Sequence, residues 1–359
     1  MSATIRFVRR SALVRWVSLA YAAVVLCASL YPLAGWRLPT EVQLWGRLAE
    51  WPRYYTWSDV LLNVAAYAPL GLLLTLWLRT RLQPIAAATV ALLLAATLSF
   101  GMELLQAFVP PRVPSALDLF CNAVGALVGA WVALAAGEGW LRHDMLLRWR
   151  NRHLAPGGLA DAGLALLGLW LLTQIDTTFW MFGTGDVRHL LPSFAMPYTA
   201  AGYMAFEAAV AALGLVTVFA IAGVVAPARA AIVVAIVVLL ALAFKSTATS
   251  WLPQPGRALL WVTPGTAVGM GVGIVGGILL LRLPAGRRRA ASGLAALVAG
   301  MLLLNVAPDN PYLAATLQTA RGGHLWSLGG ATRIISMCWP VAAGWFFLTA
   351  LRRFERSTP

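Results

Sequence analysis

The sequence predicts an all-α fold, a polytopic transmembrane helical bundle of about ten helices with both termini in the cytoplasm. Of its 359 residues, 60% are hydrophobic and only 11% are charged, and the mean hydropathy of +0.77 is outside the range of soluble domains. The apolar residues form runs long enough to cross a hydrocarbon core of about 30 Å. The arginines between these runs are unevenly distributed, which predicts an orientation in the membrane.

The apolar runs predict where each helix begins and ends. They span residues 12–33, 59–79, 83–109, 117–136, 157–176, 199–226, 230–249, 262–281, 290–306 and 332–351. The first follows basic residues, as a signal peptide would, but its length and the absence of a small-residue cleavage site before Trp36 predict a retained anchor. In the second, Pro69 and the nearby Gly71 predict a kink that frees the carbonyl of Ala65.

Glycines recur every four residues in two of these runs. Gly269, Gly273 and Gly277, like Gly125 and Gly129, predict smooth faces for close helix packing. The stretch VGMGVGIVGG also contains G-x-G-x-x-G, but a dinucleotide site requires that motif to follow a strand and open a soluble helix. We therefore predict packing and no nucleotide.

A cytoplasmic N-terminus places most loop arginines on the cytoplasmic side, as the positive-inside rule requires. These arginines lie in 6–15, 79–81, 142–152, 229, 282–289 and 352–356. The outer loops would hold Arg37, Arg47, Arg53, Arg112, Arg188, Lys245, Arg257 and Arg321. The net charge of +14 is thus explained by topology, and no single basic stripe indicates a nucleic-acid partner.

Two connecting stretches are amphipathic and predict helices that lie flat on the bilayer. One is VQLWGRLAEW at 42–51, and the other is the basic WLRHDMLLRWRNRHL at 140–154. We therefore expect a transmembrane domain at 1–139, a cytoplasmic basic amphipathic connector at 140–156 and a C-terminal transmembrane helical domain at 157–359.

The cysteines and histidines predict neither a disulfide framework nor a metal site. Cys27, Cys121 and Cys338 lie in predicted helices without a C-x-x-C spacing, and we expect them to be small core residues. The histidines are scattered outside the apolar runs. We expect no metal and no cofactor.

Polar side chains concentrate in the second to fourth predicted helices and in the turn between the third and fourth. They are Asp59, Asn63, Glu103, Gln106, Arg112, Asp118 and Asn122. Residues three or four apart share a helix face, so each helix has one polar side, and the alternation of the helices brings these sides to the outer half of the membrane. Burying such a group in the membrane without a partner costs several kcal/mol, about 3 kcal/mol or more for a charge. We therefore predict a polar pocket beneath Arg112, with helix capping by Asp59 and Asp118 and simple helix-to-helix bonding as the alternative.

These residues also resemble a known family. The pattern D-x3-N-x5-P-x-G, followed by E-x2-Q-x5-R-x5-D-x3-N-x2-G, is similar to the VanZ-like membrane domain over about residues 20 to 136. The resemblance implies a small helical bundle in the bacterial cytoplasmic membrane, in a family named after an accessory protein of glycopeptide-antibiotic resistance. Resistance to teicoplanin-type compounds belongs to particular members. Longer members have an extra helical half, which NVAPDNPYL, HLWSLGG and CWP resemble here.

Four functions fit this pocket. We expect it to bind a lipid-linked or amphiphilic cell-envelope component, with Arg112 as the anion contact and Glu103 and Asp118 as its charge partners. The alternatives are a membrane enzyme that uses two carboxylates as acid and base on a headgroup, a proton-coupled transporter and a scaffold. No catalytic residue is assigned, and the expected partners are membrane lipids or a lipid-linked precursor. In the C-terminal half, Glu207 and Arg333 are candidates for a pair.

Overall fold

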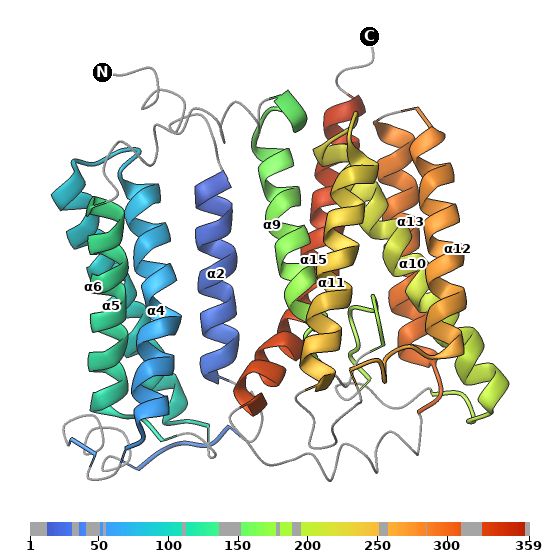
Figure 1. Ribbon diagram of the computed structural model, residues 1–359. Helices are drawn as coiled ribbons and strands as arrows, with labels where there is room; N and C mark the ends of the chain where they lie inside the picture. Colours follow the sequence, from blue (N-terminus) through green and yellow to red (C-terminus); the bar gives the residue numbers. More distant parts are fainter. Residues whose placement is uncertain are drawn as a thin grey trace. The chain divides into compact units, whose positions relative to one another are not determined.

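The computed structural model divides the chain into two compact units, Met1–Trp149 and Arg150–Pro359, each of them helical (Figure 1). The structure describes residues 13–30, 36–40, 51–52, 55–109, 113–135, 152–176, 180–188, 195–250, 258–284, 286–309 and 325–355. The division falls within the predicted connector 140–156. Most of that connector and of the amphipathic stretch 42–51 lies outside the described residues.

The first unit contains four helices: α2 (Leu13–Leu30), α4 (Trp57–Leu78), α5 (Pro84–Gln106) and α6 (Ala116–Ala135). Their core is apolar and built around Tyr67, Leu70 and Leu74 of α4, which pack with Ala91 of α5 and Ala126 of α6. α4 remains continuous through Pro69. Figure 1 shows that α4 begins, α5 ends and α6 begins at the same end of this unit. The polar residues near these helix ends therefore lie at the same end of the unit.

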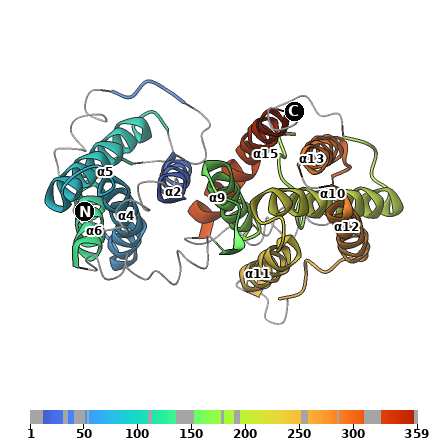
Figure 2. The ribbon, with the colours of Figure 1, turned by 90° about the horizontal axis from the view of Figure 1, so that it is seen from above.

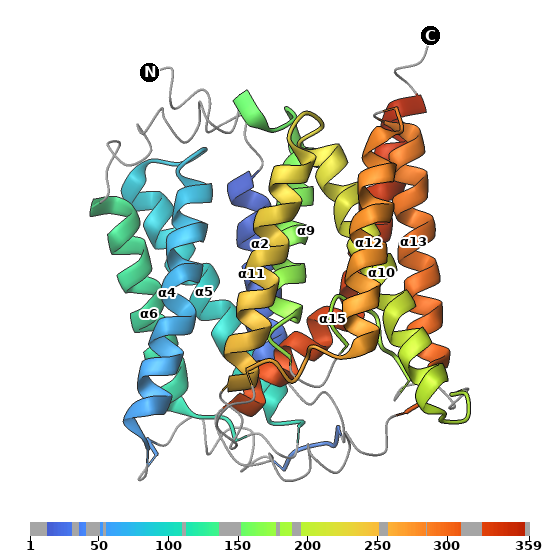
Figure 3. The same cartoon turned by 45° about the vertical axis from the view of Figure 1, so that its right-hand side comes forward.

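The second unit contains six helices: α9 (Gly158–Thr173), α10 (Ala200–Val225), α11 (Ala230–Ser250), α12 (Pro264–Arg282), α13 (Arg287–Val306) and α15 (Leu325–Glu355). α10 contacts α9, α11, α12 and α13 and is the most buried of the candidate spans. Seen from above, α10 runs obliquely across its neighbours (Figure 2), and Figure 3 shows it passing behind α12. Because it is surrounded, α10 is apolar on all sides rather than amphipathic.

The glycine faces pack as predicted. A Cβ on Gly269 or Gly273 would lie within 3 Å of the backbone of α10, at Ala208 and Ala212. On α6, a Cβ on Gly129 would overlap the carbonyl oxygen of Ala68 on α4. Both helix pairs therefore depend on glycine for their close approach.

Nine of the described helices are long and apolar enough to cross a membrane. α9 is the exception, since its 16 residues are fewer than the ~20 that a span requires. The all-α helical fold is thus confirmed, whereas the orientation stays a prediction. One expectation was wrong: Cys121 is buried, but Cys338 is exposed and is not a core residue.

We expect cysteine-accessibility labelling to detect residues 34–56 and 308–330 outside the cell and residues 140–155 and 283–289 inside. Within the second unit, Arg282, Arg287 and Arg352 lie at the helix ends opposite to Asp176 and Asp186, as the positive-inside rule predicts for this orientation. Single cysteines in a cysteine-free background, labelled in intact and in permeabilised cells, give the measurement. Labelling of residues 140–155 in intact cells would show that the predicted orientation is wrong.

Candidate functional site

Glu103 links the end of α5 to the beginning of α6. Its side chain is 2% exposed, and its Oε2 accepts the backbone N–H of Ser115 at 2.8 Å. Ser115 directly precedes α6, and its Oγ accepts the backbone N–H of Asp118 at 3.4 Å, as a helix-capping serine does. Ser115 therefore connects Glu103 and Asp118, two of the three acids of the predicted pocket, at the junction of α5 and α6.

Two amides connect α6 to its neighbours. Asn63 Nδ2 on α4 donates to Asp118 Oδ1 at 2.8 Å. One turn further into α6, Asn122 Nδ2 donates to Ser99 Oγ on α5 at 2.9 Å. Four of the predicted residues, Asn63, Glu103, Asp118 and Asn122, thus form one polar cluster across three helices.

The other predicted residues have different surroundings. Asp59 accepts the Thr56 hydroxyl at 2.6 Å, while its backbone N–H donates to Thr56 Oγ1 at 3.2 Å, which is a local cap at the start of α4. Gln106 Nε2 donates to the carbonyl of Ser29 at 3.0 Å and ties α5 to the end of α2. Arg112 lies outside the described residues.

Tyr67 and Ser99 also belong to this cluster, although neither was predicted from the sequence. The buried Tyr67 hydroxyl faces Ser99 and lies within electrostatic range of Glu103. Among the described residues, it makes no hydrogen bond, and neither does the buried Oδ1 of Asn122. Helical spacing carried the signal, because Tyr67 is four residues after Asn63 and Ser99 four before Glu103.

The second unit has its own polar groups, which the structure pairs differently from the expectation. Glu207 accepts the hydroxyls of Thr263, at 2.6 Å, and Thr266, at 3.2 Å, and so ties α10 to α12. Glu207 was a candidate partner of Arg333, but its carboxylate is bonded to these two threonines, and the charge of Arg333 acts on Asp186.

Lys245 was expected in an outer loop, but it lies inside α11 and is 2% exposed. Its Nζ donates to the carbonyl of Asp176, whose carboxylate faces it. In the part of the chain that the structure describes, no three His, Cys, Asp or Glu side chains gather as metal ligands would.

Apolar helices of membrane-spanning length, with buried polar side chains clustered at their ends, define a multi-pass helical membrane protein. Residues 11–137 match the model of the VanZ/LLP1 family, which covers the four helices of the first unit. Residues 11–137 therefore form a VanZ-like region of a multi-pass membrane protein, and the second unit follows that region. No curated protein and no solved structure matches the chain.

Proposed function

We propose that the VanZ-like unit binds a lipid-linked or amphiphilic component of the cell envelope, in the cytoplasmic membrane of a bacterium. The observation that carries this proposal is the polar cluster of Asn63, Glu103, Asp118 and Asn122. A carboxylate as buried as Glu103 is rarely retained at membrane depth without a role. Each unpartnered buried polar group costs about 1–3 kcal/mol, and a ligand that donates to Asn122 Oδ1 would remove that cost.

The surroundings of the cluster favour an amphiphile. Glu103 lies in the last turn of α5 and Asp118 in the first turn of α6, where spanning helices reach the headgroup region. Exposed apolar side chains lie on the same turns: Leu62 beside Asn63, Leu105 near Glu103 and Phe120 near Asp118. A ligand with a polar head and a hydrocarbon tail would satisfy both surfaces.

An enzyme is the second candidate, because the Glu103 carboxylate and the backbone N–H of Asp118 are both bonded to Ser115, which brings two acidic residues to the junction of α5 and α6. Two carboxylates in such a site can differ in proton affinity and serve as acid and base on a headgroup. Turnover of a bound polyprenyl phosphate by the purified protein would select this candidate, and unchanged recovery of the lipid would select binding.

We expect Glu103→Gln to leave the protein at normal abundance in the membrane and to abolish its envelope phenotype, measured as the teicoplanin susceptibility of an expressing Gram-positive host. Glutamine preserves shape and can still accept the Ser115 N–H, but it removes the charge. Asp118→Asn and Arg112→Ala should act in the same way. Abundance is measured on immunoblots of the same cells.

Glu207→Gln is the matched control, since it makes the same change at a buried glutamate in the other unit. It should leave the phenotype unchanged. Binding of a polyprenyl phosphate to the purified variants, followed by native mass spectrometry, tests the ligand class directly. Normal abundance, phenotype and binding in all three VanZ-unit variants would refute the proposal and leave a scaffold.

A further inference from the structure

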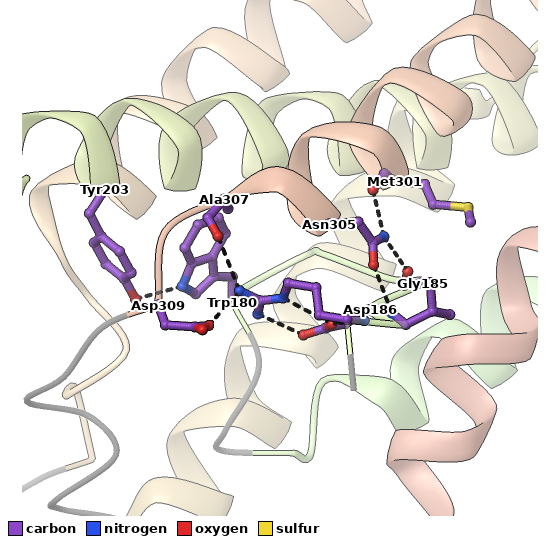
Figure 4. Close-up of polar contacts among 10 residues, drawn as sticks. Trp180, Gly185, Asp186, Tyr203, Met301, Asn305, Ala307 and Asp309 are labelled. Carbon is purple, nitrogen blue, oxygen red and sulfur yellow. Dashed lines mark hydrogen bonds and ion pairs between the residues drawn. The ribbon is translucent and has the colours of Figure 1, made fainter. Parts of the chain in front are cut away.

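A non-helical segment of the second unit carries Arg188, two residues after Asp186, which Figure 4 labels. The guanidinium donates to the buried Asp186 twice, from Nε to Oδ1 at 3.1 Å and from Nη2 to Oδ2 at 2.8 Å. Burial opposes ionisation of Asp186, but the bonds to Arg188 outweigh it and lower the pKa of that carboxyl. The pair is therefore charged at neutral pH.

Asn305, at the end of α13, braces the backbone on both sides of Asp186. Its Nδ2 donates to the carbonyl of Gly185 at 2.8 Å, and its Oδ1 accepts the N–H of Val187 at 2.9 Å. Gly185 has φ +87°, where a side chain is disfavoured, and a Cβ there would clash with Pro340. The segment is thus built to present Arg188 from a rigid backbone.

The remaining nitrogen of Arg188 points to a weaker and more exposed partner. Nη1 donates to Asp309 Oδ1 at 2.8 Å and to the carbonyl of Ala307 at 3.3 Å. The side chain of Asp309 is 78% exposed, against 24% for that of Arg188. An exposed ion pair contributes about 0–1 kcal/mol to the stability of a protein. Another anion can therefore replace Asp309 at Nη1 with little loss of stability.

Aromatic side chains lie beside this nitrogen. Trp180 Nε1 donates to the Tyr203 hydroxyl at 2.6 Å, and the two rings meet edge to face at 5.0 Å. Tyr203 is close enough to Arg188 to act on its charge, and Tyr198 packs against Tyr203. Trp and Tyr are typical of the headgroup level of a bilayer, where one end of the ring is apolar and the other is hydrated.

We propose that Arg188 and Asp309 bind the headgroup of an aminophospholipid, with the phosphate on Arg188 Nη1 and the ammonium on the Asp309 carboxylate. Arg188 is bonded to two carboxylates, of which only that of Asp309 is exposed, so a phosphate can take the Nη1 position while the released Asp309 carboxylate binds the ammonium of a dipolar headgroup. Asp309 is the more exposed of the two side chains, so its carboxylate is accessible to the terminal ammonium of a headgroup. This site belongs to the second unit and is independent of the function proposed for the first.

The test is native mass spectrometry of the full-length purified protein, titrated with phosphatidylethanolamine, phosphatidylglycerol or diacylglycerol. We expect wild type to retain phosphatidylethanolamine at least tenfold more tightly than phosphatidylglycerol. Asp309→Asn should reduce this preference to about twofold or less, because the amine loses its charged partner. Arg188→Gln should lose both phospholipids to the level of diacylglycerol.

Arg287→Gln is the matched control, since Arg287 also pairs with an exposed acid, Glu355. Arg287 begins α13, whereas Asp309 follows the other end of that helix. This variant should bind like wild type. Equal retention of the two phospholipids by wild type, or an unchanged preference in Asp309→Asn, would overturn the proposal. Asp309 is exposed, so that variant should fold even if Arg188→Gln does not. Competition by free phosphoethanolamine at the same concentration as the lipid would overturn the assignment to a lipid.

Discussion

Replacing Gly273 by leucine should lower the free energy of unfolding by about 3 kcal/mol or more, the upper end of the range for overpacked sites. A Cβ at this position would lie 2.9 Å from the carbonyl oxygen of Ala212 and 2.9 Å from its Cα. Backbone atoms of a packed helix cannot move aside as a flexible side chain can. The change would therefore force α10 and α12 apart along their whole contact.

Gly271 provides a matched control in the same helix, because a Cβ there would meet nothing within 4 Å. Gly271→Leu should change stability by less than about 1 kcal/mol, since its side chain enters open space. Thermal unfolding in detergent micelles compares the two variants. Equal loss of stability in both variants would mean that the approach of Gly273 to α10 is not responsible, because leucine favours a helix more than glycine does at either position.

Replacing Lys245 by methionine should destabilise the second unit by about 3–5 kcal/mol, because it leaves the Asp176 carboxylate buried without its facing cation. Both side chains are buried, and Thr332 Oγ1 also donates to Asp176 Oδ2 at 3.4 Å. The double variant Lys245→Met, Asp176→Asn should recover part of the loss, since no unpaired charge remains.

A double-mutant cycle on these positions measures the coupling. The matched cycle uses the exposed pair of Arg287 and Glu355, 3.1 Å apart, and should give a coupling below about 1 kcal/mol. If the losses from Lys245→Met and Asp176→Asn simply add, the two residues are not an energetic pair, and other contacts hold Lys245 in α11.

Helix positions could be predicted closely because a lipid environment leaves a spanning backbone few alternatives to the helix. The run 199–226 corresponds to α10 at Ala200–Val225, and the run 83–109 to α5 at Pro84–Gln106. α13 begins at Arg287 rather than at residue 290, because three arginines continue its helix beyond the apolar run. α15 begins at Leu325 rather than at residue 332, which the sequence did not indicate.

Only the part of the site that depends on residues sharing one helix face could be predicted from the sequence. Spacing placed Asp118 and Asn122 on one face of α6, and the structure bonds that face to Asn63 and to Ser99. It could not identify the backbone N–H of Ser115 as the partner of Glu103, because every residue has that donor and only the turn between α5 and α6 aims this one.

The sequence by itself determined the class of the protein, the approximate limits of its helices, and the faces on which polar groups and glycines lie. These properties are local, since they depend on hydropathy and on the period of a single helix. Only the tertiary structure decided the partners: Glu207 with two threonines, Arg333 near Asp186, and Arg188 between Asp186 and Asp309. Pairing depends on which helices pack together and at what rotation, and no spacing within one segment contains that information.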